Sequence, residues 1–263
     1  MIEILKTINI TKRFGGIIAV NNVSITVRKG TITAIIGPNG AGKTTFLNII
    51  SGVISPDRGE VFFEGKNITR LPPHERARLG IARTFQNIAV FPSLTVFDSI
   101  RTAIIGVKKS NSLLKLLNIN AFKREKDLSP YDETHEIMKI ASIMGLAGKE
   151  LNRVFHLTQA MQRVLDIAMA LAMKPKLLLL DEPTSGLAYE DIPHIIKLIK
   201  SLKEASPDLT IILVEHKLEV VRDLADKVIV MKEGKVIAEG SYNEVVSNKE
   251  VIEAYLGVSS ASD

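Results

Sequence analysis

The chain has 263 residues, a formal net charge of +5 and a hydrophobic fraction of 46%, which is ordinary for a globular protein. This length allows a large hydrophobic core, built as one domain with a subdomain. The absence of cysteine excludes disulfide bonds and thiolate metal ligands. We expect no membrane-spanning helix, because no apolar run reaches about 18 residues. We also expect no nucleic-acid binding, because the basic residues are scattered and not clustered with aromatic ones.

The first third of the chain alternates predicted strands with short helices. Five runs rich in apolar and β-branched residues are predicted as strands: Ile2–Ile10, Val23–Val27, Thr31–Ile36, Gly59–Glu64 and Ile81–Phe85. Residues 46–50 have helical spacing before Gly52, and a second helix begins at Pro72-Pro73 and continues to Leu79. Between the first two strands lies Phe14, which is either a core residue or an aromatic face for an adenine ring.

The most informative stretch fits the pattern G-x-x-x-x-G-K-[ST] and lies between a predicted strand and a predicted helix. Its residues are Gly37, Pro38, Asn39, Gly40, Ala41, Gly42, Lys43, Thr44 and Thr45. Glycines let backbone N–H groups approach a polyphosphate, and the next helix offers unpaired N–H groups and a positive dipole end. Lys43 is a cation at that end, a conflict that a bound anion removes, and Thr44 would place its hydroxyl on Mg²⁺. The alternative is a glycine-rich turn, which we disfavour because motif and context agree.

The central part of the chain has the period of helices and no clear strands, so residues 87–174 are predicted to form a helical subdomain. Helices are expected at Thr95–Val107 and Glu133–Met144. Between them, Lys108–Pro130 is predicted to be an exposed insertion with a short amphipathic helix at Leu113–Leu117.

Two acids follow a run of leucines in the next part of the chain. Thr158 is expected to cap a helix over Gln159–Met173, whose apolar residues form one stripe. Then Leu177–Leu180 predicts a fully buried parallel strand that delivers Asp181 and Glu182 to the edge of the sheet where ligands bind. With a phosphate loop elsewhere in the chain, Asp181 is a natural Mg²⁺ group, and Glu182 can polarise a water molecule.

The remaining chain is predicted to contain a helix at Glu190–Ala205, a strand at Leu209–Val214 and a hairpin formed by Val228–Met231 and Val236–Ala238. A last helix is predicted at Tyr242–Leu256, followed by a polar tail at Val258–Asp263. Two polar residues stand at the carboxyl ends of predicted strands, where ligands of α/β proteins bind. Gln86 can reach a metal or water there, although such a residue alone is more often part of a loop. His216 can contact a γ-phosphate, although a lone histidine is usually structural.

In their order and spacing, four motifs resemble those of the nucleotide-binding subunits of ABC transporters. They are GPNGAGKTT at 37–45, RTFQN at 83–87, LLLLDEPTSGL at 177–187 and VEH at 214–216. The resemblance covers about residues 3–256, and KRFGGIIAVNNVS, RTFQN and the insertion after Gly106 look most like the subunits for branched-chain amino acids and related small polar solutes. It implies an α/β fold: a P-loop NTPase core with a mixed sheet (1–86 and 175–256), an N-terminal antiparallel β subdomain and a helical subdomain.

The resemblance also implies roles for single residues, carried over by position. Phe14 would stack on adenine, and Gly37–Thr45 would hold the phosphates of ATP. Glu182 would be the general base for hydrolysis, and His216 would hold the γ-phosphate and the attacking water.

Metal and partners are implied in the same way. Thr44, Gln86 and Asp181 would hold or assist Mg²⁺, and Gln86 would also sense the membrane domain. The family architecture implies an ATP-sandwich dimer on the cytoplasmic face of the cell membrane, docked to membrane permease subunits. An extracytoplasmic solute-binding protein would be an indirect partner.

The chain departs from the family in two places. The signature loop, usually Leu-Ser-Gly-Gly-Gln, aligns without a gap to Leu157, Thr158, Gln159, Ala160 and Met161. Ala188 stands where the dimer-contact loop commonly has Asp or Asn. Because a signature loop serves the nucleotide of the other subunit, we expect a heterodimer with a second ATPase subunit that supplies a regular signature. A homodimer is the alternative.

Three functions are compatible with these features. The first is an importer ATPase that energises a permease. The second is a soluble ABC ATPase without a transport role, although such proteins resemble paired cassettes or carry long coiled coils that this chain lacks. The third is a regulatory nucleotide-binding subunit with weak catalysis, which the altered signature suggests. A generic GTPase is disfavoured, because Asn248–Val251 lacks the aspartate that would bind guanine.

Overall fold

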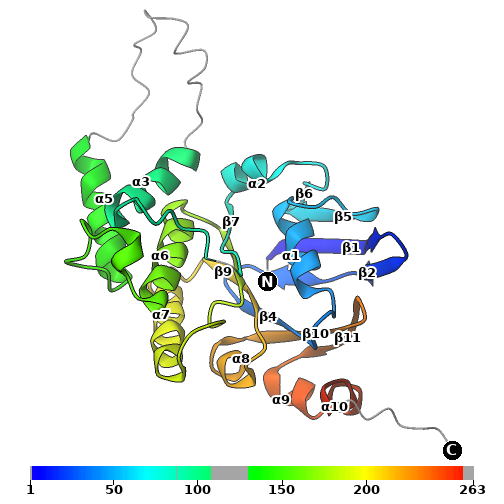
Figure 1. The fold of residues 1–263 in the computed structure, drawn as a ribbon. Helices are drawn as coiled ribbons and strands as arrows, with labels where there is room; N and C mark the ends of the chain where they lie inside the picture. The colour runs from blue at the N-terminus through cyan, green and yellow to red at the C-terminus, as the bar shows by residue number, and fades with distance from the viewer. Residues whose placement is uncertain (1, 87, 108–129, 257–263) are drawn as a thin grey trace, which may run out of the picture. The chain divides into compact units, whose positions relative to one another are not determined.

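The computed structural model describes residues 2–86, 88–107 and 130–256 (Figure 1). The chain divides into two compact units, Met1–Gln86 with Lys176–Asp263, and Asn87–Pro175. The predicted helix at Leu113–Leu117 and the predicted tail at Val258–Asp263 lie outside the described residues. No helix in the described ranges has the length and apolar character needed to cross a membrane.

The first unit contains a six-stranded sheet in the order β11-β10-β4-β9-β8-β7. Its strands are β4 (Ile32–Ile36), β7 (Ile81–Arg83), β8 (Leu177–Asp181), β9 (Thr210–Val214), β10 (Lys227–Lys232) and β11 (Lys235–Gly240). All pairs are parallel except β10 with β11, which form the predicted hairpin. Every residue of β4, β8 and β9 is buried, which explains why these central strands are continuous apolar runs in the sequence.

A second, antiparallel sheet has the order β2-β1-β5-β6, with β3 paired to β1. Its strands are β1 (Glu3–Phe14), β2 (Ile17–Val23), β3 (Thr26–Arg28), β5 (Arg58–Phe63) and β6 (Lys66–Asn67). The predicted strand Val23–Val27 is wrong, because Val23 ends β2 and β3 begins only at Thr26. Most of β2 was also not predicted from the sequence. The turn at Gly15 reverses the chain, and Ile17 at the start of β2 pairs with Phe14 at the end of β1.

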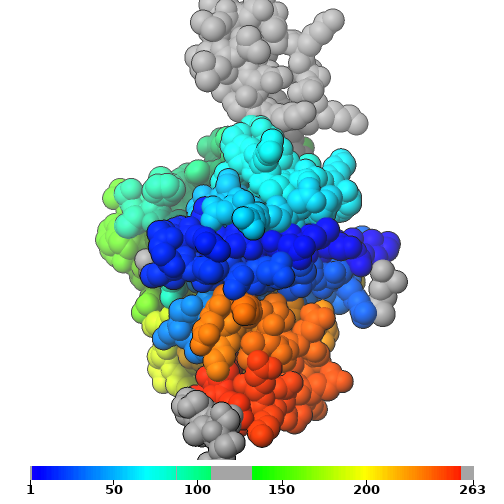
Figure 2. All heavy atoms as spheres, turned by 90° about the vertical axis from the view of Figure 1, so that its right-hand side faces the viewer, coloured from blue at the N-terminus to red at the C-terminus, as the bar shows by residue number. Residues whose placement is uncertain are grey.

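Helices cover the first unit on both faces of its parallel sheet. They are α1 (Lys43–Ser51), α2 (Pro73–Leu79), α7 (Ile192–Ala205), α8 (Leu218–Leu224), α9 (Tyr242–Val246) and α10 (Lys249–Leu256), with the short 3-10 helix η2 (Tyr189–Asp191) before α7. One core joins α1 to both sheets through residues such as Phe46, Ile35 and Val61. On the opposite face of β4 and β10, Val221 of α8, Val245 of α9 and Val251 of α10 pack together. Figure 2 shows β1, in dark blue, crossing one face between the cyan segment around α2 and the orange and red segments of β10 to α10.

The predicted single helix Tyr242–Leu256 is wrong, because the chain forms α9 and α10 there. The side chain of Asn248 accepts hydrogen bonds from the backbone N–H groups of Glu250 and Val251, at 2.9 and 3.3 Å. This is an asparagine cap at the start of a new helix. Helix α8 was also not predicted from the sequence.

The second unit consists of helices: α3 (Val96–Val107), α5 (Pro130–Ile143), η1 (Val154–His156) and α6 (Gln159–Ala172). Helix α6 packs against α3 and α5. It is therefore buried on more than the one stripe that the sequence predicts, and Arg163 and Asp166 are both buried, with Nη1 and Oδ2 3.7 Å apart. Thr158 caps this helix as predicted, since its hydroxyl oxygen accepts from the backbone N–H of Met161.

Candidate functional site

The loop Gly37–Thr45 connects β4 to α1, and its backbone accepts only glycine at two positions. Gly37 has φ +148°, and a Cβ there would lie 2.0 Å from the carbonyl oxygen of Met231. Gly42 has φ +95°, and a Cβ there would lie 2.1 Å from the carbonyl oxygen of Ala19. The loop is thus held tightly against two neighbouring strands, and glycine is required by space as well as by conformation.

Lys43 lies at the start of α1 with its side chain folded back over the loop. Its ammonium group donates to the carbonyl oxygens of Gly37, at 2.8 Å, and Pro38, at 3.0 Å. Burial lowers the pKa of Lys43, while the negative charges of Glu182 and Asp181 act in the opposite direction. A positive charge is thus buried beside the positive end of a helix dipole, an arrangement that a bound anion stabilises.

The N-terminus of α1 is open to such an anion. Its capping residue, Gly42, makes no side-chain hydrogen bond to the helix, and the first turn contains no acidic residue. The backbone N–H groups of a first helical turn lack partners within the helix. Their direction and the dipole make this end of α1 suited to an anion such as phosphate.

A cavity of about 610 Å³ lies over this loop in the first unit. It collects most of the residues that the sequence predicts for the site, together with four that the sequence reading missed. The predicted ones are Asn39, Gly40, Ala41, Gly42, Lys43, Thr44, Thr45, Gln86, Glu182 and His216. The missed ones are Ile17, Ile18, Ala19 and Glu233.

Phe14, the predicted adenine platform, is not among the described residues that line this cavity. Its ring is half-exposed on β1, and the ammonium of Lys12 lies 5.6 Å from the ring centroid. Ile17, the partner of Phe14 across the hairpin, does line the cavity. The two isoleucines that follow Gly15-Gly16 were the sequence signal for this apolar wall. They were not recognised because β2 was not predicted.

Three predicted residues, Gln86, Glu182 and His216, are bonded together. The carboxylate of Glu182 accepts from the side-chain amide of Gln86, with Nε2 to Oε2 2.8 Å, and bonds to His216, with Nε2 to Oε1 2.6 Å. The backbone of Glu182 has φ +49°, and its N–H donates to the carbonyl oxygen of Val214 at 2.9 Å. This left-handed turn directs the chain away from β8 immediately after the strand. The carboxylate is therefore held from two sides and is only 8% exposed.

Asp181 is fully buried, and its carboxylate is bonded to Arg83, a residue of the RTFQN motif for which no role was predicted. Its Oδ2 accepts from Nη2 of Arg83 at 2.8 Å, and its Oδ1 has no hydrogen-bond partner among the described residues. Burial raises the pKa of Asp181, and the hydrogen bond from Arg83 opposes that rise. Arg83 also donates through Nη1 to Asn48 and Ser51 of α1, at 2.6 and 2.9 Å. Arg83 thus ties the ends of β7 and β8 to α1.

The segment Leu157–Met161 belongs to the second unit and is described there by itself. Leu157 is buried, Thr158 and Gln159 are exposed, and Ala160 is half-buried. The hydroxyl of Thr158 accepts from the backbone N–H of Met161 at 3.3 Å. In the first unit, Ala188 is exposed and precedes η2.

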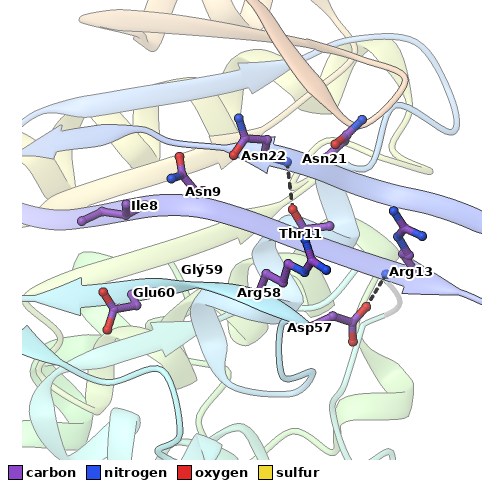
Figure 3. Close-up of a pocket in the computed structure, with 10 residues that line it drawn as sticks. All are labelled: Ile8, Asn9, Thr11, Arg13, Asn21, Asn22, Asp57, Arg58, Gly59 and Glu60. Atoms are coloured by element: carbon purple, nitrogen blue, oxygen red, sulfur yellow. Dashed lines mark hydrogen bonds between the residues drawn. The ribbon is translucent and has the colours of Figure 1, made fainter.

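A larger cavity of about 790 Å³ lies on the antiparallel sheet, where β1, β2 and β5 contribute its walls (Figure 3). Its polar groups already bond to each other. Asp57 accepts from the backbone N–H of Arg13 at 2.6 Å and from the ammonium of Lys12 at 2.8 Å, and these bonds lower its pKa. The backbone N–H of Asn22 donates to the hydroxyl of Thr11 at 3.1 Å. Size alone therefore does not select the functional cavity; the convergent donors over Gly37–Thr45 do.

Comparisons with known proteins agree with this choice. A family model described as ABC transporter matches residues 20–185, and one described as Branched-chain amino acid ATP-binding cassette transporter matches residues 235–261. The probable branched-chain amino acid transport ATP-binding protein LivG of Archaeoglobus fulgidus is 36% identical over 255 residues, which cover 97% of this chain and 96% of that protein. The high-affinity branched-chain amino acid transport ATP-binding protein BraF of Pseudomonas aeruginosa is 33% identical, over 97% of this chain and 98% of that protein.

Solved structures are similar over nearly the whole chain. A crystal structure of the ADP conformation of an ATP-binding cassette from an ABC transporter has a TM-score of 0.82 at 33% sequence identity, covering 98% of this chain and all of that one. A dimeric cassette in a post-hydrolysis state with ADP and Pi has a TM-score of 0.75 at 26% identity, covering 90% of this chain and 98% of that one.

Proposed function

The chain belongs to the ATP-binding proteins of ABC transporters, of the branched-chain amino-acid type, and from this premise we propose that it hydrolyses ATP to drive import of branched-chain amino acids through a membrane permease. The observation that carries the catalytic part is the position of Glu182. Its carboxylate lines the cavity over the phosphate loop and is bonded to both Gln86 and His216. The solute follows from the relatives' names and from the match at residues 235–261.

In this mechanism, Gly37–Thr45 and the N-terminus of α1 hold the phosphates of ATP, and Lys43 compensates their charge. Each oxygen of the Glu182 carboxylate has two lone pairs and uses one in the bonds to Gln86 and His216. A free lone pair accepts the proton of a water molecule while the water oxygen bonds to the γ-phosphorus and the bond to ADP breaks. His216 holds the γ-phosphate and keeps Glu182 oriented. Ile17 and Ile18 offer an apolar wall beside Phe14 for the adenine.

The residues also fit Mg²⁺. The buried Oδ1 of Asp181 has no hydrogen-bond partner in the described part of the chain, and a hard cation prefers such a carboxylate oxygen. Thr44 and Gln86 line the nucleotide cavity and would hold the ion with a hydroxyl and a side-chain amide; Asp181 is not among the lining residues and would assist from the buried end of β8. Mg²⁺ bound there would neutralise charge on the β- and γ-phosphates.

The two units would divide the work. We assign ATP binding and chemistry to the first unit, and permease docking with the signature-equivalent segment Leu157–Met161 to the second. The protein would then be peripheral on the cytoplasmic face, with a second ATPase subunit as its dimer partner. A solute-binding protein outside the cell would deliver the amino acid.

Docking is supported by exposed aromatic residues in the second unit. Phe91 and Phe155 are more than half exposed, and the backbone N–H of Phe155 donates to the carbonyl oxygen of Pro92 at 3.2 Å. The two aromatic residues are thus carried by segments that are bonded to each other. Leu94, three residues after Phe91, is half-buried. Phe91 and Phe155 therefore offer apolar surface to a permease loop.

The proposed function is tested in vesicles that contain this chain, its permease subunits and its second ATPase subunit. ATP added on the side of this chain should drive uptake of labelled leucine, isoleucine or valine, and uptake should stop when Glu182→Gln is introduced. Hydrolysis without uptake of any of the three would refute the solute assignment. Absence of hydrolysis in the complete assembly would refute the catalytic assignment and favour a regulatory subunit.

Docking has its own prediction. Phe91→Asp replaces exposed apolar surface by a charge, so co-purification with the permease should fall by at least about tenfold, the loss of roughly 1.4 kcal/mol or more of contact free energy. ATP affinity should not change, because the first unit is untouched. Ile143→Asp in α5, an exposed apolar residue of the same unit, is the matched control. Equal co-purification of the Phe91→Asp variant and the unaltered chain would remove Phe91 from the docking surface.

A further inference from the structure

Glu215 is a buried carboxylate that has no part in the mechanism above. It follows the last residue of β9 and is only 2% exposed. An isolated buried charge costs several kcal/mol, so a carboxylate persists in such a place only when hydrogen bonds satisfy it. Glu215 is not among the residues that line the nucleotide cavity, and we assign it no contact with ATP.

Four hydrogen bonds satisfy this carboxylate, and they come from two different loops. Oε1 accepts from the hydroxyl of Thr184 at 2.6 Å and from its backbone N–H at 3.0 Å. Oε2 accepts from the backbone N–H groups of His216, at 3.0 Å, and Lys217, at 3.5 Å. A second link joins the same loops, since the ammonium of Lys217 donates to the carbonyl oxygen of Thr184 at 3.0 Å.

The position of this link in the chain gives it significance. The parallel pairing of β8 with β9 ends at Asp181 and Val214. Glu182 makes one more backbone bond, to Val214, and then turns away with φ +49°. Beyond this point the Glu215 side chain replaces the strand ladder as the connection between the two loops.

Those two loops carry the bonded pair at the centre of the proposed mechanism. Thr184 is two residues after Glu182, and His216 directly follows Glu215. The distance between Nε2 of His216 and Oε1 of Glu182 is 2.6 Å, and a bond of that length tolerates little displacement of either backbone. A group bonded to both loops therefore determines whether the pair forms.

We propose that Glu215 is a positioning residue for ATP hydrolysis, which holds the loop after β8 and the loop after β9 together so that Glu182 and His216 stay paired. The inference rests on the proposed roles of Glu182 and His216. Glu215 acts through these residues and touches neither the nucleotide nor the water.

The chemistry of the four bonds makes the carboxylate irreplaceable by an amide. Each oxygen of Glu215 accepts from two donors. In glutamine, one oxygen becomes an NH₂ group, a donor with no acceptor capacity. In either orientation that NH₂ would face a backbone N–H group, of Thr184 or of His216. Glu215→Gln is thus nearly isosteric but breaks one of the two links.

The test measures kcat and KM for ATP in the assembled transporter. Glu215→Gln should lower kcat by about tenfold or more, the expected consequence of misplacing a catalytic pair, while KM changes by less than about twofold. Thr184→Val, which removes only the hydroxyl, should lower kcat by about threefold to tenfold, and Thr184→Ser, which keeps hydroxyl and N–H, should restore it. Glu204→Gln in α7 makes the same chemical change at an exposed site and should have no effect.

A double-mutant cycle separates positioning from general stability. If Glu215 acts through His216, the loss of kcat caused by His216→Ala should be at least about threefold smaller in the Glu215→Gln background than in the unaltered chain. A merely structural role would lower the melting temperature and ATP affinity together and leave the effect of His216→Ala undiminished. If Glu215→Gln does not fold, the same cycle is measured with Thr184→Val.

Several results would overturn the inference: kcat of Glu215→Gln within about twofold of the unaltered chain, full additivity with His216→Ala, or equal losses in Thr184→Val and Thr184→Ser. Failure of the proposed function is recognised separately. If Glu182→Gln leaves turnover intact, the roles of Glu182 and His216 are wrong. If Glu182→Gln abolishes turnover and Glu215→Gln does not reduce it, only the inference about Glu215 is wrong.

Discussion

Two loops of this chain precede helices that are predicted to face phosphate, and they are built differently. Gly37–Thr45 leads into α1 in the first unit, and Leu157–Met161 leads into α6 in the second. Neither helix has an acidic residue in its first turn, so both dipoles favour an anion. The capping residue of α1 is Gly42, without a side chain, whereas the hydroxyl of Thr158 in α6 accepts from the N–H of Met161.

This difference concerns how much of the helix end remains for a ligand. At α1 the chain leaves the first-turn N–H groups to the phosphate, and the backbone is so close to Met231 and Ala19 that glycine is required. At α6 one of those groups is already bonded to Thr158, and Gln159 and Ala160 carry side chains where the family has glycines. We therefore expect the chain to hold its own ATP well and to serve the ATP of a partner less well. This asymmetry is the basis of our expectation of a second, different ATPase subunit.

The largest expected effect tests whether the first unit carries the chemistry. Glu182→Gln keeps the shape of the side chain but removes the base, so turnover should fall by about a hundredfold or more while ATP binding is retained. The measurements are phosphate release and ATP affinity of the same preparation. The equivalent change in the partner subunit should have a smaller effect, because hydrolysis is expected mainly at the site that contains Glu182. Equal losses from the two changes would refute the asymmetry.

A second prediction concerns the glycine loop itself. Gly42→Ala places a Cβ 2.1 Å from the carbonyl oxygen of Ala19, so the loop must move. ATP affinity should fall by about thirtyfold, corresponding to roughly 2 kcal/mol of strain and lost contacts. Gly40→Ala is the matched control, since Gly40 also has a positive φ of +80° but a Cβ there meets nothing within 4 Å. Isothermal titration of both variants separates conformational strain from the clash, and similar affinities would show that the clash is unimportant.

A third prediction reverses the difference at α6. Gln159→Gly combined with Ala160→Gly restores close backbone approach at the signature-equivalent segment, and should raise ATP hydrolysis by the isolated chain by about tenfold. The control is Gln162→Ala, which removes side-chain donors to the carbonyl oxygens of Val154 and Leu157 and leaves the loop without new glycines. Brisk hydrolysis by the unaltered single chain would contradict the premise of this experiment, since both signatures of a homodimer are altered.

The smallest effect concerns an additional anchor of the phosphate loop. Tyr255 of α10 is 39% exposed, and its partial burial raises the pKa of its phenol to about 12, while a hydrogen bond between the phenol and the backbone of Gly37 opposes that rise. A group with a raised pKa in the folded state contributes stability below its unfolded pKa of about 10 and loses it as the pH rises toward 12. The stability advantage of the unaltered chain over Tyr255→Phe should therefore be constant from pH 7 to 9 and shrink above pH 10.

Urea unfolding across this pH series measures the effect, with Tyr189→Phe as the control at a tyrosine that is 76% exposed. A pH-independent difference between the unaltered chain and Tyr255→Phe would show that the phenol does not titrate differently in the folded protein. Among the described residues, the segment Leu157–Met161 is held by Gln162, whose side-chain amide donates to the carbonyl oxygens of Val154 and Leu157. The comparison of the two loops therefore extends to how firmly each is held.

Local patterns in the sequence were sufficient for the parts of the site that lie close together in the chain. The glycine pattern at 37–45, the leucine run before Asp181 and the helix cap at Thr158 each depend on neighbours within a few residues, and their predicted elements are observed. The resemblance to the ATP-binding subunits of ABC transporters was inferred from the order of these motifs and is confirmed by the comparisons. Boundaries were less accurate at turns such as Gly15 and Asn248, where one residue redirects the chain.

The tertiary structure alone decided which side chains from distant segments meet. Arg83 and Asp181 are 98 residues apart in the chain, yet their side chains are 2.8 Å apart, because β7 and β8 are neighbours in the parallel sheet. Glu215 finds Thr184 by the same pairing of β8 with β9. Sequence patterns report burial and local conformation, and they do not report which buried polar group will satisfy another. That is determined by sheet order, because a charge excluded from water is stable only beside the donors that the fold brings to it.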